Sequence, residues 1–241
     1  MRSSNSFYNH FIMKPICRHG RGFTLVELLV TITIIAILAG LSFAGATLFI
    51  KKAAAAKDTS TLRQISACIN MYSSDNNDYL PGPLFTGQTP VYKNPLSANI
   101  KEYRRLAECF APYLGREDPK SGEVITNMTS SWQKTLDQQN SPAFYMQQKL
   151  TLGDGPTVQC PWGKPAPASG EERIPMKLQT VLAQPKAGRT WAMTELDQLH
   201  PDIGTADWKS KVPEGMIHGN YRLALYFDGS VSQVNQDNSR K

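Results

Sequence analysis

The chain has 241 residues, of which 41% are hydrophobic and 19% are charged, and its formal net charge is +6. This length suits one or two domains and is enough to bury a core. Four of the basic residues and no acidic residue lie in 1–22, so the pI of 9.1 is largely an effect of that segment, and composition gives no argument for nucleic-acid binding.

The segment 23–50 is apolar except for one charge, Glu27. About 20 apolar residues in a helix cross a hydrocarbon core of ~30 Å, so this segment predicts a membrane-spanning helix. Basic residues lie on both sides of it, Arg18 and Arg21 before and Lys51 after. A carboxylate inside such a segment is costly, which makes Glu27 a candidate functional residue.

The order Gly-Phe-Thr-Leu-Val-Glu at 22–27, after a basic leader and before a long apolar run, resembles the type III signal of type IV pilins and type II secretion pseudopilins. The resemblance implies that a prepilin peptidase cuts between Gly22 and Phe23 and methylates the amine of Phe23. It implies a charge pair between Glu27 and the N-terminal amine of a neighbouring subunit. It also implies a single-pass inner-membrane protein with a cytoplasmic leader and a periplasmic C-terminal domain, which can be extracted into a filament.

Two simpler explanations of the segment remain. An uncleaved signal anchor would leave Glu27 at the headgroup boundary by chance. A secretory signal peptide could be cut after Ala46, because Ala44-Gly45-Ala46 fits a small-residue cleavage site. The apolar core of such a peptide is about 7–15 residues long, however, and this run exceeds that length before Ala44.

The segment 51–74 is predicted to continue the helix. Leu62, Ile65, Ile69 and Tyr72 recur at spacings of three, four and three, which predicts one apolar face against a sheet, with Cys68 and Met71 near it. Polar residues 74–78 are predicted to end the helix in a turn. Asp75, Asn77 and Asp78 could also ligate Ca²⁺, but the turn is the simpler explanation.

The segment 75–241 is predicted to form one α+β domain. A helix is expected over 101–114, ending at Gly115, followed by a polar loop over 116–142. Residues 143–152 fit a strand or a short helix, 157–160 form a short apolar patch, and 161–170 fit a loop. No role is assigned to 84–190.

The C-terminal part predicts strands over 190–196, 221–227 and 230–234, the last two joined in a hairpin by Asp228-Gly229. The expected fold is thus α+β: a long N-terminal helix packed on a small antiparallel sheet, which the resemblance describes as pilin-like.

The segment 218–229 begins with His218 and ends, after nine further residues, with Asp228-Gly229. It resembles the H-x9-DG pattern of planctomycete and verrucomicrobial prepilin-like proteins, many of which carry His where this chain has Ser230. On a straight strand the two ends would lie ~33 Å apart, too far for a catalytic dyad. Structural roles are therefore expected. Asp228 would accept hydrogen bonds in its turn, and His218 would pack or cap at the other end of the strand.

Few residues point to chemistry. Glu195, Asp197, Asp202 and Asp207 offer oxygen ligands for Ca²⁺ in one loop region, although a solvated loop is the commoner explanation and no cofactor is predicted. Cys109 and Cys160 could form a disulfide in an oxidising periplasm or remain thiols. An enzyme is not expected, because the chain lacks G-x-S-x-G and H-E-x-x-H and only His200 and His218 follow the leader.

The predicted function is that of a structural subunit of a type II secretion pseudopilus, with the prepilin peptidase, other pilin or pseudopilin subunits and the inner membrane as partners. The first alternative is a type IV pilin for adhesion, motility or DNA uptake. Pilins often carry a C-terminal disulfide loop, and no cysteine follows Cys160, which favours the pseudopilin. The alternative from another class is a membrane-anchored periplasmic binding or hydrolytic protein.

Overall fold

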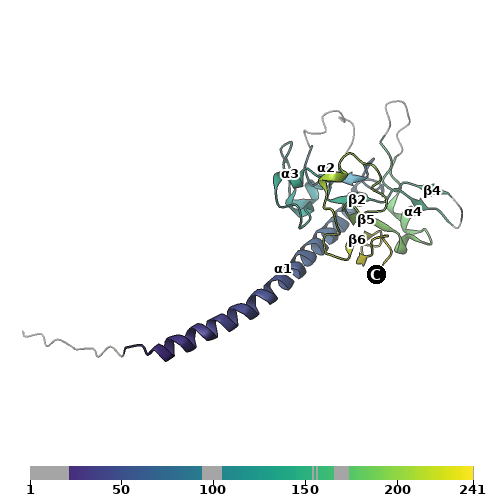
Figure 1. Cartoon of the computed structure of the whole chain (residues 1–241). Helices are drawn as coiled ribbons and strands as arrows, with labels where there is room; N and C mark the ends of the chain where they lie inside the picture. The colour runs from purple at the N-terminus through teal and green to yellow at the C-terminus, as the bar shows by residue number, and fades with distance from the viewer. Residues whose placement is uncertain (1–21, 94–104, 154, 156, 166–173, 241) are drawn as a thin grey trace, which may run out of the picture. The chain divides into compact units, whose positions relative to one another are not determined.

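The structure is a computed structural model that describes residues 22–93, 105–153, 155, 157–165 and 174–240. The chain divides into two compact units, 1–48 and 49–241. One helix, α1 (Leu25–Asp75), contributes to both (Figure 1). The predicted helix over 23–74 is therefore confirmed, with small differences at its ends.

In the first unit, the described part of α1 exposes large apolar side chains on all sides, including Leu25 at 80% and Ile35 at 64%. By length and composition, α1 is the one helix in the described ranges that could cross a membrane. A helix that is hydrophobic all round needs lipid or other protein around it. In length and in apolar surface, α1 is therefore suited to cross a membrane.

The second unit is built on a five-stranded antiparallel sheet in the order β1-β2-β5-β6-β7. Its strands are β1 (Gly87–Gln88), β2 (Phe144–Met146), β5 (Trp191–Glu195), β6 (Arg222–Tyr226) and β7 (Val231–Val234). The three predicted C-terminal strands correspond to β5, β6 and β7. The sheet and α1 together confirm the predicted α+β fold.

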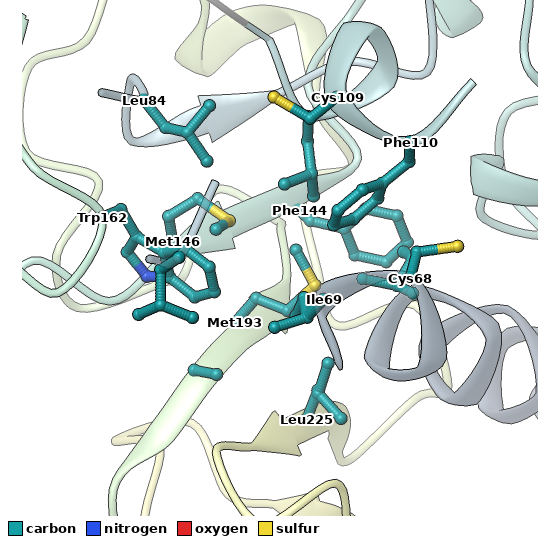
Figure 2. Close-up of a cluster of buried hydrophobic side chains, with 14 of the residues drawn as sticks. Cys68, Ile69, Leu84, Cys109, Phe110, Phe144, Met146, Trp162, Met193 and Leu225 are labelled. Carbon is teal, nitrogen blue, oxygen red and sulfur yellow. The ribbon is translucent and has the colours of Figure 1, made fainter. Parts of the chain in front are cut away.

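The C-terminal part of α1 covers one face of this sheet, as its apolar spacing predicts. Leu62, Ile65, Ile69 and Tyr72 are all buried. Figure 2 shows Cys68 and Ile69 of α1 in one cluster with Phe144 of β2, Met193 of β5 and Leu225 of β6. The expectation for Met71 was wrong, because it is 41% exposed. It lies two residues after Ile69, which is slightly more than half a turn of the helix, so it is on nearly the opposite side of α1.

The opposite face of the sheet is covered by the segment after β5. Leu196, Ile203 and Val212 pack there against residues such as Ala224 and Tyr226 of β6. Because successive side chains of a strand point to opposite faces, β6 contributes to both cores and all five of its residues are buried. The segment after β5 was expected to be a solvated acidic loop, but its apolar residues form a layer that covers this face of the sheet.

The middle of the chain differs from the prediction in several places. In place of one helix over 101–114, the described residues hold α2 (Leu106–Phe110) and the 3₁₀ helix η2 (Pro112–Leu114), which ends at Gly115 as expected; 101–104 lie outside the described residues. The predicted loop over 116–142 contains η3 (Thr126–Met128) and α3 (Leu136–Gln139), the latter stabilised by a capping box from Thr135.

Short elements account for the other differences. Residues 143–152 form two strands, β2 and β3 (Leu150–Thr151), and β3 pairs with β4 (Val158–Gln159). The elements α4 (Leu178–Leu182), η4 (Ala187–Arg189), η5 (Lys209–Lys211) and β1 were not predicted. Of the predicted loop 161–170, only 161–165 are described, and these five residues form neither a helix nor a strand of a sheet.

Candidate functional site

The first site of interest is the start of α1, where the sequence places the processing and assembly residues. Gly22 and Phe23 lie immediately before the helix and are exposed. An added Cβ at Gly22 would meet no atom within 4 Å. The peptide bond between the two residues is therefore not covered by the rest of the described chain.

Glu27 lies in the first turn of α1 and is hydrogen-bonded to Thr24. The Thr24 backbone N–H donates to Glu27 Oε2 at 2.9 Å, and the Glu27 backbone N–H donates to Thr24 Oγ1 at 3.2 Å. The Thr24 hydroxyl also donates to Glu27 Oε2 at 2.8 Å. This is a reciprocal capping box, which satisfies backbone donors that a helix N-terminus otherwise leaves without partners. In the single subunit, Glu27 is thus held by its own helix.

The second site is a buried charge cluster of Asp58, Glu195 and His218, which come from α1, the end of β5 and the segment before β6. His218 Nε2 lies 3.0 Å from Glu195 Oε1 and 3.4 Å from Asp58 Oδ2. The side chains of both carboxylates are 0% exposed and that of His218 is 3% exposed. The cluster therefore joins α1 to the sheet through charged groups inside the domain.

Backbone and hydroxyl donors fix the two carboxylates in this charge cluster. The Ser131 backbone N–H donates to Asp58 Oδ1 at 2.6 Å, and the Ser131 hydroxyl donates to Asp58 Oδ2. The Leu223 backbone N–H donates to Glu195 Oε2 at 2.8 Å. The imidazole of His218 stacks on the Tyr221 ring, with 5.1 Å between centroids. Each carboxylate thus has one oxygen on a backbone amide and the other near the imidazole.

The protonation of the charge cluster is set by burial and by its own pairing. Burial raises the pKa of Glu195 to about 7, although His218 beside it acts in the opposite direction. Burial alone would lower the pKa of His218, but its hydrogen bonds to Asp58 and Glu195 outweigh that effect and raise the pKa to about 9. Near neutral pH the imidazole is therefore charged, and it faces two carboxyl groups.

A separate buried network lies around Arg222 of β6. Its guanidinium makes two hydrogen bonds to the Asp197 carboxylate and donates to Asn238 Oδ1 at 3.1 Å. His200 Nε2 lies 2.8 Å from Thr194 Oγ1 and 3.0 Å from Asn238 Nδ2. Burial, together with the positive charge of Arg222, lowers the pKa of His200 to about 3. This network ties the segment after β5 and the C-terminal residues to the sheet.

The four acidic residues considered as calcium ligands do not form one site. Glu195 pairs with His218, Asp197 pairs with Arg222, and Asp202 and Asp207 are exposed. Among the described residues, Asp58, Glu195 and His218 are the one group of three or more acidic, cysteine or histidine side chains whose ligand atoms converge, all within 4.8 Å of one another. The four residues considered for calcium are therefore not brought together by the fold.

The alternative calcium ligands at the end of α1 belong to its terminating turn. Asn77 and Asp78 have positive φ values of 53° and 71°. Asp78 Oδ2 accepts a hydrogen bond from the Gln179 backbone, and Asp75 Oδ2 accepts one from the Tyr113 hydroxyl. These contacts are those of a helix-ending turn attached to the domain.

Cys109 and Cys160 are thiols in the structure, so the disulfide considered for them is not present. Cys109 lies in the apolar core beside Phe110 (Figure 2). The Cys160 thiol donates to the Gly163 carbonyl, with 2.9 Å between Sγ and O.

The two ends of the H-x9-DG segment have different partners, and both meet α1. Asp228 Oδ1 accepts hydrogen bonds from the Ser230 backbone N–H at 2.9 Å and from its hydroxyl at 2.7 Å. Gly229 has φ +83°, and an added Cβ there would lie 3.1 Å from Ser66 Oγ of α1. His218 contacts Asp58, two helical turns earlier on α1. The segment thus brackets β6 with two contacts to the same helix.

Asp58 is a site residue that sequence reasoning missed. It precedes Leu62 by four residues and Ile65 by seven, so it lies on the same face of α1 as the buried apolar stripe. A carboxylate in phase with a predicted core face was the available signal, because a buried charge must find a partner.

Comparison with known proteins identifies the N-terminal segment. Residues 17–43 match the model of the prokaryotic N-terminal methylation motif, a match that includes Gly22, Phe23 and Glu27. No curated protein and no solved structure matches the chain. The chain therefore carries a prepilin-type signal, an apolar N-terminal helix that fits a membrane anchor, and a pilin-like α+β fold.

Proposed function

We propose that this chain is a prepilin-like structural subunit of a type II secretion pseudopilus. A prepilin peptidase would cut it between Gly22 and Phe23 and methylate Phe23, after which it would assemble through its N-terminal helix. The observation that carries the proposal is the methylation motif over 17–43, which includes a stretch, 23–41, with no buried side chain.

The exposed apolar surface supports assembly through α1. Before assembly, lipid would surround residues 25–48, and the domain would lie in the periplasm. In a filament, other copies of the helix would replace the lipid, so that packing between helices rather than transfer out of water drives association. The larger part of the driving force would then depend on how closely neighbouring helices approach.

Glu27 has a defined part in this assembly. Cleavage creates an amine on Phe23, four residues before Glu27. In a low-dielectric bundle this carboxylate would pair with the amine of a neighbouring subunit and set the register between helices. The capping box with Thr24 satisfies Glu27 before a neighbour arrives, so the charge is never left without partners.

Processing is tested by co-expression with a prepilin peptidase and intact-mass measurement of the purified chain. We expect a product that begins at Phe23 and carries one added methyl group. Gly22→Val should block the cut, whereas the matched control Gly20→Val should leave it intact. A purified chain that begins at Met1 or Thr47, despite an active peptidase, would refute the proposal.

The choice between pseudopilus and pilus is tested by deletion and by imaging. For a pseudopilin, deletion should abolish type II secretion, and only overexpression should produce filaments outside the cell. Normal secretion combined with loss of surface filaments would assign the chain to a type IV pilus. The absence of cysteine after Cys160 supports the pseudopilus.

A further inference from the structure

We propose that Asp58, Glu195 and His218 bind one divalent transition-metal ion of the zinc class, which joins α1 to the sheet. This inference concerns the folded domain and does not depend on filament assembly or on processing. The site would be structural, since its ligands come from one helix, one strand end and one loop and are nearly inaccessible to solvent.

The positions of the three ligand atoms fit one small cation. Bonds of about 2.0–2.2 Å around a tetrahedral centre separate neighbouring ligand atoms by roughly 3.3 Å. His218 Nε2 lies 3.0 Å from Glu195 Oε1 and 3.4 Å from Asp58 Oδ2, and the three atoms all lie within 4.8 Å of one another. An ion could therefore sit among them with small side-chain movements.

The surroundings hold the ligands in place. Backbone amides of Ser131 and Leu223 occupy Asp58 Oδ1 and Glu195 Oε2, which leaves Oδ2 and Oε1 directed to the imidazole. Hydrogen bonds of this kind to the outer oxygen orient a carboxylate that binds a metal. The stacking on Tyr221 fixes the plane of the His218 ring in the same way.

The balance of charge also favours a cation. Two buried carboxyl groups share one histidine, and His218 is the one ion-pair partner that they have among the described residues. A buried charge is normally paired or bound to a metal. A divalent ion bound by two carboxylates and one neutral imidazole forms a set with no net charge.

The ligand types select the metal. One imidazole and two carboxylates are typical of zinc and related ions, whereas Ca²⁺ takes six to eight oxygen ligands. Three protein ligands leave a fourth position for water or for the hydroxyl of Ser131, which already contacts Asp58 Oδ2. The expected ion is therefore Zn²⁺ rather than the Ca²⁺ considered for the neighbouring acidic residues.

The test uses the full chain in detergent, purified through an affinity tag without histidines. After treatment with EDTA, zinc chloride is added, and bound zinc and thermal unfolding are measured. We expect one zinc per chain and a rise in Tm of about 5–10 °C when zinc is at a hundredfold excess over its Kd. No bound zinc and an unchanged Tm would overturn the proposal.

Ligand variants separate this site from other zinc binding, because the leader also holds Cys17, His10 and His19. Glu195→Gln and His218→Gln should each abolish the rise in Tm and remove one zinc, whereas the control Asp202→Asn should behave as the wild type. Zinc retained by both ligand variants would contradict the site. If a ligand variant does not fold, cobalt added to the wild-type chain decides instead. Intense visible absorption bands are expected for low-coordinate Co²⁺, and their absence counts against the site.

Discussion

The two halves of α1 have nearly opposite surfaces, although they belong to one helix. Between Leu25 and Leu41, every residue is exposed and almost all are apolar. Between Asp58 and Tyr72, apolar residues follow one face and are buried against the sheet. The first half is apolar around its whole circumference. The second half is apolar on one face, and that face packs on the sheet. This difference indicates that the first half contacts lipid or other subunits and that the second half packs within its own subunit.

The acidic residues of the two halves show the same contrast. Glu27 finds its partners in Thr24, three residues away, and stays exposed. Asp58 finds its partners in Ser131 and His218, far along the chain, and is fully buried. A charge satisfied locally can change partners on assembly. A charge satisfied by tertiary contacts cannot change partners without destabilising the domain, because removal of a partner leaves a buried charge uncompensated.

The largest effect is expected for Glu27→Gln. Gln also completes a capping box, so this variant keeps the local hydrogen bonds and removes only the charge. We expect cleavage to continue and filament yield to fall at least tenfold, because the neighbouring amine loses a partner worth about several kcal/mol. Yield is measured from sheared filaments under overexpression.

The control for this variant is Thr24→Ala, which removes the cap at a cost of about 1 kcal/mol and keeps the charge. Thr24→Ala should assemble and Glu27→Gln should not. Normal filaments from Glu27→Gln would show that capping, not charge, is the role of this residue.

A smaller effect, on the domain alone, is expected from two isoleucines of the same helix. Ile65 is 1% exposed and Ile35 is 64% exposed. Ile65→Ala should lower the free energy of unfolding by about 2–5 kcal/mol through lost burial and a cavity. Ile35→Ala should change it by less than about 0.5 kcal/mol.

Urea unfolding of the two isoleucine variants, followed by tryptophan fluorescence, measures this comparison directly. All four tryptophans, at 132, 162, 191 and 208, lie in the second unit, so the signal reports only on the domain. Equal losses from the two variants would contradict the division of α1 into two functional halves.

Next in size is the close contact between Gly229 and α1. Gly229→Ala places a Cβ 3.1 Å from Ser66 Oγ at φ +83°. Gly115 has a similar φ of +72° with no atom within 4 Å of an added Cβ. We expect Gly115→Ala to cost about 1–2 kcal/mol from backbone strain alone and Gly229→Ala about 1 kcal/mol more. Urea midpoints give both values, and equal costs would remove the helix contact from the explanation.

The smallest effect is a pH dependence that originates in His200. Its folded pKa of about 3 lies below the unfolded value of 6.5, so the unfolded chain takes up a proton below about pH 6.5 that the folded chain does not. The contribution of His200 to stability is therefore complete above pH 6.5 and is lost as pH falls towards 3. Between pH 7.5 and 5 we expect a loss of about 1–2 kcal/mol.

The measurement compares wild type and His200→Phe, because Glu195 acts in the opposite direction. Its folded pKa is raised from 4.5 to about 7, so its effect on stability worsens as pH rises over that range. The difference between the two proteins isolates His200, and the variant should lose less stability on acidification. Identical losses would exclude His200 as the source.

The features that could be predicted from the sequence are those with a local signal. The motif at 22–27 is contiguous, the stripe from Leu62 to Tyr72 has a helical period, and Asp228-Gly229 between two apolar runs indicates a hairpin. Each of these depends on residues within about 15 positions of one another. For that reason the long helix, the α+β class and the three C-terminal strands could be predicted.

Which charges are buried and which distant residues meet could be learned only from the folded domain. Strands of two or three residues, such as β1 and β2, are too short to show a period, and their pairing depends on partners far along the chain. Asp58 meets His218 across 160 positions, and Glu195 and Asp197 separate into different networks although they are two residues apart. Such pairings arise because buried charges must be compensated wherever the fold brings a partner.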